Sequence, residues 1–132
     1  MVRGLGIDLV AVSRIEEAAR RHGERFLKRL FTETEIAYCA RHPQPARHWA
    51  ARFAAKEAGM KALGTGWSGG VTFRSIEVVN LASGQPTLVL HGASAERAQS
   101  LGATSAHVTI SHDGGYAMAC VVLSGPDGHV AG

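Results

Sequence analysis

The sequence predicts an α+β fold in which a small antiparallel sheet packs with one long helix and several short ones. Two observations lead to this expectation. Strand-like and helix-like segments are mixed without strict alternation, and the last two strand-like segments are separated only by a short turn rich in glycine. The chain has 132 residues, 45% of them hydrophobic and 19% charged, as in ordinary globular proteins. We therefore expect one domain spanning residues 1–132.

The N-terminal quarter is predicted to contain a strand followed by a helix. Apolar residues alternate along residues 3–10, so one face of this strand carries Leu5, Ile7 and Leu9. Ser13 is followed three residues later by Glu16, a capping-box pattern that predicts the start of a helix. We expect this helix to pause at Gly23 and to resume as far as Phe31.

Two more helices are predicted in the next third of the chain. Thr32 and Glu35 form a second capping-box pattern and predict a short helix. Residues 41–47 include two prolines and are expected to interrupt the helical structure. The longest helical pattern runs from about residue 46 to residue 63, where Gly64 is suited to the C-terminal cap.

The second half of the chain is predicted to be mainly strands. The expected elements, in order, are a glycine-rich loop at residues 64–70, strands at 72–81 and 87–91, a short helix at 94–101, and a hairpin of strands at 106–112 and 116–123. The last residues, 124–132, are expected to form a loose tail.

Charge and composition narrow the class of protein. The net charge of +3 indicates an anionic partner, which could be a nucleic acid, a phosphorylated small molecule or an acidic protein. No apolar run reaches the roughly 20 residues of a membrane span, and no secretory leader is recognisable, so we expect a cytoplasmic protein without membrane contact. Cys39 and Cys120 are isolated, which predicts packing residues and neither a disulfide scaffold nor a zinc site.

Asp8 is an unusual residue for its position. It lies inside the apolar strand pattern, where a buried carboxylate needs a cation or several hydrogen-bond donors. Magnesium would meet that need, because it takes one or two carboxylates and completes its shell with phosphate oxygens and water. The local pattern also fits a carboxylate that caps the next turn or pairs with an arginine.

Glu57 and Lys61 lie four residues apart on the long predicted helix and therefore share a face with Phe53. One interpretation is an ordinary surface ion pair. The other is a carboxylate for a metal beside a lysine for phosphate, since phosphoryl transfer depends on positioning and charge neutralisation.

The run Ser111-His112-Asp113 contains the residue types of a hydrolase triad. Adjacent strand residues point to opposite faces, and the G-x-S-x-G motif is absent, so we reject a triad. His112 fits a donor to phosphate or an ordinary turn histidine.

Basic residues recur at helical spacing after the first strand, namely Arg14, Arg21, Arg25 and Lys28. They would form one stripe if the helix axis continued past Gly23. Such a run can also be simply a solvated face.

Several segments occur together over nearly the whole chain. They are Gly6-Ile7-Asp8-Leu9-Val10, Arg14-Ile15, Phe31-Thr32 with Glu35, Arg52-Phe53-Ala54-Ala55-Lys56-Glu57-Ala58 with Lys61-Ala62-Leu63-Gly64, and Ser111-His112. In this order and separation they resemble the holo-acyl-carrier-protein synthase family of 4′-phosphopantetheinyl transferases. The resemblance implies an α+β phosphopantetheinyl transferase fold and a homotrimer with active sites at subunit boundaries.

The resemblance also implies an activity. A magnesium-dependent transferase would move the 4′-phosphopantetheine group of coenzyme A to a serine of an acyl carrier protein and release 3′,5′-ADP, in fatty-acid or polyketide synthesis. Asp8 and Glu57 would hold Mg²⁺ and Lys61 would neutralise phosphate charge. Glu57 or a metal-bound water would accept the serine proton.

Further roles follow from the same resemblance. Arg52 and His112 would contact the nucleotide half of coenzyme A. Contacts with the acidic helix of the carrier protein would come from Arg14, Arg21 and Arg25. Asp113 departs from the threonine that many relatives carry after Ser-His, which puts the role of His112 in question.

Two other functions fit part of the sequence. A small nucleic-acid-binding module would explain the basic charge, but aromatic residues are only 6% of the chain and no ribonucleoprotein pattern is present, so we expect no nucleic-acid partner. A noncatalytic adaptor would explain the basic stripe, yet it gives no reason for Asp8 and Glu57.

Overall fold

The computed structural model describes residues 1–127. Its elements, in chain order, are β1 (Val2–Ala11), α1 (Val12–His22), α2 (Glu24–Leu30), α3 (Glu33–Ala40), α4 (Pro45–Leu63), the 3₁₀ turn η1 (Phe73–Ser75), β2 (Ile76–Asn80), β3 (Pro86–Leu90), α5 (Gly92–Ser100), β4 (Ser105–Asp113) and β5 (Tyr116–Ser124). The predicted α+β fold is confirmed, and most predicted elements are present. Of the predicted tail, residues 128–132 lie outside the described part of the chain.

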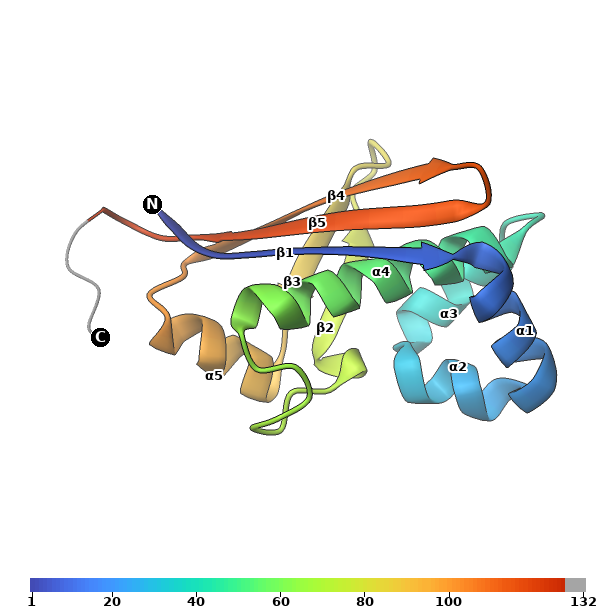
Figure 1. Ribbon diagram of the computed structural model, residues 1–132, viewed down its shortest axis with the longest axis horizontal. Coiled ribbons are helices and arrows are strands. Elements are labelled where there is room, and N and C mark those ends of the chain that lie inside the picture. The colour runs from blue at the N-terminus through green and yellow to red at the C-terminus, as the bar shows by residue number, and fades with distance from the viewer. Residues whose placement is uncertain (128–132) are drawn as a thin grey trace.

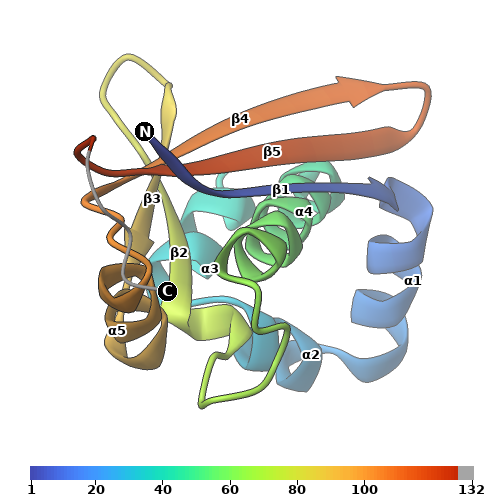
Figure 2. The same cartoon turned by 60° about the vertical axis from the view of Figure 1, so that its left-hand side comes forward.

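The main sheet has three antiparallel strands in the order β1-β5-β4, and β2 pairs with β3 in a separate hairpin. The long helix α4 runs beneath the three-stranded sheet, with α1, α2 and α3 on one side of it and the β2-β3 hairpin and α5 on the other (Figures 1 and 2). Asp8 of β1 lies opposite Ala119 of the central strand, which in turn lies opposite Ile110 of β4. These three residues therefore share the face that meets α4.

The helix α4 is buried on nearly all sides because small residues line it. Ala50, Ala54, Ala55 and Ala58 are each 0% exposed. It begins with Pro45, whose lack of an N–H costs nothing in the first turn. The break predicted at residues 41–47 is therefore too long, because α4 already begins at Pro45. The helix ends at Gly64, which has the left-handed conformation (φ 74°) expected of a C-terminal cap.

Two predicted boundaries are wrong, the first because a backbone contact with a distant residue replaces the local signal and the second because a local turn precedes the strand. Ser13 does not cap α1; that helix follows β1 directly, and its first N–H, from Val12, donates to the carbonyl oxygen of Gly115 at 2.9 Å. The strand expected from residue 72 begins at Ile76 instead, because Thr72 and Ser75 form a reciprocal hydrogen-bonded turn before it. The Thr32 and Glu35 capping box is confirmed.

The sheet face turned away from α4 is apolar and open. Leu5, Ile7 and Leu9 of β1 are 65%, 56% and 60% exposed, and Met118 and Tyr116 of β5 lie on the same face with 41% and 50% exposed. Within residues 1–127 no other element covers this face (Figure 2). The predicted grouping of the three β1 side chains is confirmed, but their face lies outside the core.

None of the helices in the described part of the chain is long and apolar enough to span a membrane.

Both cysteines are free thiols. Cys39 is buried, and that burial raises its pKa to about 11, so it behaves as the packing residue that was predicted.

Candidate active site

Two glycines let β1 lie directly on α4. A Cβ atom at Gly6 would stand 1.9 Å from the carbonyl oxygen of Ala58, and one at Gly4 would stand 2.2 Å from that of Ala62. No side chain fits such gaps, so the strand backbone packs against the helix backbone. The next residue of β1 on the same face is Asp8, which this close packing holds against α4.

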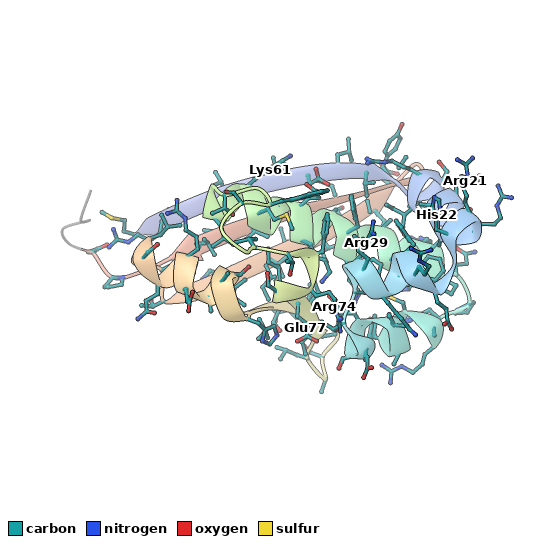
Figure 3. All side chains as sticks on the ribbon, turned by 90° about the horizontal axis from the view of Figure 1, so that it is seen from below. Arg21, His22, Arg29, Lys61, Arg74 and Glu77 are labelled. Atoms are coloured by element: carbon teal, nitrogen blue, oxygen red, sulfur yellow. The ribbon has the colours of Figure 1, made fainter. Side chains whose placement is uncertain are left out.

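Lys61 reaches from α4 to this carboxylate. Its Nζ donates to the carbonyl oxygen of Ile7 at 2.8 Å and lies 3.3 Å from Oδ1 of Asp8. The Asp8 side chain is only 17% exposed, whereas that of Lys61 is 55% exposed. Figure 3 shows Lys61 beside β1, at some distance from Arg21 and His22 at the end of α1. The ammonium is therefore held at an accessible edge of the site.

Glu57 completes the group. Its pKa is raised above the usual range, mainly by burial and then by the nearby Asp8 carboxylate, while Lys61 and Arg14 oppose the shift. Arg14 also lies over the ring of Phe53, with its Cζ 5.7 Å from the ring centroid. The structure thus brings together two repelling carboxylates with two cations beside them.

These carboxylates fit a hard divalent cation. Among residues 1–127 no group of three His, Cys, Asp or Glu side chains is placed to hold a metal. A metal bound here would therefore have Asp8 and Glu57 as its protein ligands. A metal held by imidazole or thiolate does not suit that donor set. Mg²⁺ does, because it usually keeps several waters and takes further oxygens from a phosphate substrate.

A second group of predicted residues lies around the start of α4. Nε2 of His112 lies 3.1 Å from the carbonyl oxygen of Arg47. Arg52 is 3% exposed, donates from Nη2 to Oδ1 of Asn80 at 2.6 Å, and stacks its Cζ 4.0 Å from the ring centroid of Tyr38. The Nε of Arg52 is buried without a hydrogen-bond partner.

His48 lies among these cations. Its pKa is lowered to about 4, chiefly by burial and then by His42, Arg52, His112 and Arg47. Two of these neighbours, Arg47 and Arg52, are permanent cations, and their charge suits an anionic ligand. Neither Arg47 nor His48 was among the predicted site residues; the spacing of His48 and Arg52, four residues apart on α4, was the available signal.

One chain does not bring the two groups together. Asp8 is on β1, at one edge of the three-stranded sheet, and His112 is on β4, at the other edge, with α4 packed across the face between them. Lys61 and Arg47 are also fourteen residues apart on α4, about 21 Å along its axis. Within one chain these residues therefore form two separate groups, which we call the carboxylate half-site (Asp8, Glu57 and Lys61) and the cationic half-site (Arg47, His48, Arg52 and His112).

The basic residues after β1 do not lie on one helix. Gly23 (φ 62°) separates α1 from α2, so the continuous axis that the stripe required is not present. Arg21 and Arg25 still line one hollow of about 410 Å³, together with His22, Phe26 and Arg29. Arg14 lies apart from them, beside Glu57. His22 and Arg29 were missed, although both continue the basic spacing.

A buried ion pair supports the site from behind. Lys56 and Glu35 are both 0% exposed, and Nζ of Lys56 lies 2.7 Å from Oε1 of Glu35. The same ammonium donates to the carbonyl oxygens of Phe73 and Ile76 at 2.9 and 2.6 Å. Burial lowers the pKa of Lys56, and Glu35 opposes that shift. Because Lys56 precedes Glu57 in the sequence, this network fixes the rotation of α4 and with it the direction of the Glu57 side chain.

The rejected hydrolase triad is also absent from the geometry. Ser111 faces outward opposite Met118, whereas His112 lies opposite the buried Ala117 on the inner face. The two side chains therefore lie on opposite faces of β4.

Comparison with known proteins gives a consistent result. The family model described as the 4′-phosphopantetheinyl transferase superfamily matches residues 4–121. A holo-acyl-carrier-protein synthase of Solidesulfovibrio magneticus is 53% identical over 125 residues, which is 95% of this chain and 100% of that protein.

Solved structures are similar as well. The crystal structure of the holo-acyl-carrier-protein synthase from Neisseria meningitidis matches with a TM-score of 0.86 at 32% identity, covering 94% of this chain and 99% of that one. The Helicobacter pylori synthase in complex with coenzyme A matches with a TM-score of 0.80 at 34% identity, covering 91% and 99%.

Proposed function

The chain belongs to the holo-acyl-carrier-protein synthase family of 4′-phosphopantetheinyl transferases, and we propose that it transfers the 4′-phosphopantetheine group of coenzyme A to a serine of apo-acyl carrier protein. The second product is 3′,5′-ADP. One observation carries the proposal: Lys61 pairs with Asp8 at 3.3 Å where β1 packs on α4, and Glu57 is near enough for its pKa to be raised by burial and then by the Asp8 charge. Two carboxylates and an accessible ammonium are the groups needed to hold a metal-bound diphosphate.

The coenzyme A complex of the Helicobacter pylori relative supports coenzyme A as the substrate. Asp8 and Glu57 would hold Mg²⁺, which when bound supplies positive charge for the diphosphate oxygens. This assignment rests on the two neighbouring carboxylates: burial, and then repulsion from Asp8, raises the pKa of Glu57.

Within this site each residue has a defined task. Lys61, which is 55% exposed, donates hydrogen bonds to the phosphate oxygens on which negative charge grows as the carrier serine attacks the β-phosphate. Arg14 adds a second positive charge beside Glu57. Glu57 is the group of this chain best suited to accept the serine proton, because burial and Asp8 make its carboxylate more basic than usual.

The cationic half-site would hold the nucleotide half of coenzyme A through Arg52 and His112. The permanent charges of Arg47 and Arg52 beside His48 favour an added anion. Asp113 lines the same hollow as His112 and Arg47, so its carboxylate would face away from the phosphate or weaken that contact.

We further propose a homotrimer in which the carboxylate half-site of one subunit meets the cationic half-site of another. Two features support it. The half-sites lie at opposite edges of the sheet in a single chain, and the outward sheet face exposes the apolar side chains Leu5, Ile7, Leu9, Tyr116 and Met118. Light scattering should give the mass of a trimer, and an active monomer at assay concentration would contradict the shared site.

The carrier protein is proposed to dock on α1 and α2 through Arg14, Arg21 and Arg25. The hollow that Arg21 and Arg25 line suits an acidic helix.

We also propose that the reaction takes place in the cytoplasm, as part of fatty-acid or polyketide synthesis. The two free thiols fit a reducing compartment.

The function is tested by chromatography of reactions that contain the protein, coenzyme A, Mg²⁺ and an apo-carrier. We expect 3′,5′-ADP to form in equal amount to the modified carrier, and none to form when the carrier or Mg²⁺ is left out. Formation of 3′,5′-ADP without a carrier would indicate a hydrolase instead.

A further inference from the structure

Lys61 already occupies the position of a cation at the carboxylate half-site. Its Nζ lies 3.3 Å from Oδ1 of Asp8 and is anchored to the carbonyl oxygen of Ile7 at 2.8 Å. Lys61 also opposes the rise in the pKa of Glu57, which burial and then Asp8 cause. This ammonium, together with Arg14, therefore offsets part of the repulsion between the two carboxylates of one chain.

That arrangement conflicts with metal binding. An ammonium that stays 3.3 Å from a carboxylate oxygen lies within about 6 Å of any cation bound to the same oxygen. A unit and a double positive charge at this separation repel by enough to weaken metal binding roughly tenfold, even in water. Lys61 is 55% exposed and has a flexible stem, so it is free to leave Asp8.

We propose that Lys61 is a displaceable substitute cation, which keeps Asp8 and Glu57 in place before loading and must leave Asp8 when the metal binds. This inference rests on the proposed function. An ammonium released from Asp8 is available to the diphosphate of coenzyme A. Metal and coenzyme A therefore load cooperatively, and Lys61 accounts for part of the coupling between them.

Manganese binding to the free protein tests the proposal, with electron paramagnetic resonance of unbound Mn²⁺ as the readout. Lys61→Met should bind Mn²⁺ about tenfold more tightly than the wild type in the absence of coenzyme A. Lys61→Arg, which keeps the charge, should bind it about as weakly as the wild type. Lys28→Met is the matched control, since Lys28 pairs with Glu24 on α2, and it should leave the affinity unchanged.

Added coenzyme A gives a second readout. It should raise the Mn²⁺ affinity by a larger factor in the wild type than in Lys61→Met, because the variant has no ammonium to displace. If Lys61→Met is less stable than the wild type without metal, thermal unfolding still reports the difference in affinity. Mn²⁺ should raise the Tm of Lys61→Met by more than that of the wild type.

Two results would overturn the inference in different ways. If Asp8→Asn abolishes Mn²⁺ binding but Lys61→Met binds no more tightly than the wild type, the metal site stands and the role of Lys61 is wrong. If the wild type binds no Mn²⁺ through Asp8 with or without coenzyme A, the proposed metal site fails together with the inference.

Discussion

Gly6 and Ala58 are in backbone contact: the Cβ that Gly6 lacks would stand 1.9 Å from the carbonyl oxygen of Ala58. This contact fixes the distance between β1 and α4. Because Asp8 is carried by β1 and Glu57 by α4, it also fixes how the two carboxylates face each other.

Gly6→Ala should therefore separate the strand from the helix. We expect a loss of stability of several kcal/mol, since the clash is with backbone and cannot be relieved by a rotamer change, and a large loss of Mn²⁺ affinity. Denaturant unfolding and Mn²⁺ titration measure the two effects. Gly59→Ala is the matched control, because its Cβ would meet only the Ile76 side chain, at 3.2 Å, and a helical alanine has the better propensity. Equal effects of both variants would contradict this role of Gly6.

Because Lys56 and Glu35 form a buried pair, we expect the single variant Lys56→Met to be much less stable than the double variant that also changes Glu35. Lys56→Met leaves the Glu35 carboxylate buried and unpaired, which should cost about 3–5 kcal/mol. Lys56→Met with Glu35→Gln removes that charge and should recover much of the loss on urea unfolding, while the glutamine still accepts from the N–H of Val78. A double variant as unstable as the single one would show that packing, and not charge, is lost.

Sequence reasoning found what is encoded locally. The Thr32 and Glu35 capping box needs only residues three apart, and the end of α4 needs only Gly64. By contrast, the buried ion pair of Glu35 depends on Lys56, which is 21 residues away in the sequence. Lys56 reaches Glu35 only after α3 packs on α4.

The site shows the same limit. Asp8, Glu57 and Lys61 were recognisable from motif resemblance, but their meeting depends on glycines of β1 whose packing partner is 52 or more residues further along the chain. Nothing near His48 predicts that His112 lies beside it, because β4 reaches the start of α4 only in the folded chain.

His48 predicts a pH dependence of stability. Its pKa is lowered from 6.5 to about 4 in the fold, so between these values the unfolded chain takes up a proton that the folded protein does not. Stability should therefore be lost as the pH falls from about 6.5 to about 4. We expect an effect on the order of 1 kcal/mol, because the ring is partly exposed and screened.

His48→Gln should flatten this part of the stability profile measured by thermal unfolding at several pH values. His107→Gln, on the outward face of β4, is the matched control and should leave the slope as it is. An unchanged slope in His48→Gln would rule out the histidine as its source.

Charge reversal in the hollow on α1 and α2 tests whether these residues bind the carrier protein or take part in the chemical step. Arg21→Glu with Arg25→Glu should raise the KM for the carrier and reduce its dependence on salt, because surface charges are screened beyond about 10 Å at 0.1 M. Affinity for coenzyme A should stay the same. Arg14 is left unchanged because it lies beside Glu57. Steady-state kinetics decide the matter, with Arg20→Glu, which lines a different hollow, as the control for altered charge. Weaker coenzyme A binding with an unaltered carrier KM would make the hollow a nucleotide site.

The central claim is that Asp8 and Glu57 form the metal site of a phosphopantetheinyl transferase, and intact-mass analysis of an apo-carrier protein tests it most directly. With the wild-type protein, coenzyme A and Mg²⁺, the carrier should gain the mass of one phosphopantetheine group, and a chelator should prevent the gain. Asp8→Ala and Glu57→Ala, each confirmed to be folded, should slow the gain by at least about 10²-fold. A carrier that keeps its mass with the wild-type protein, or that is modified at the wild-type rate by either variant, would contradict the claim.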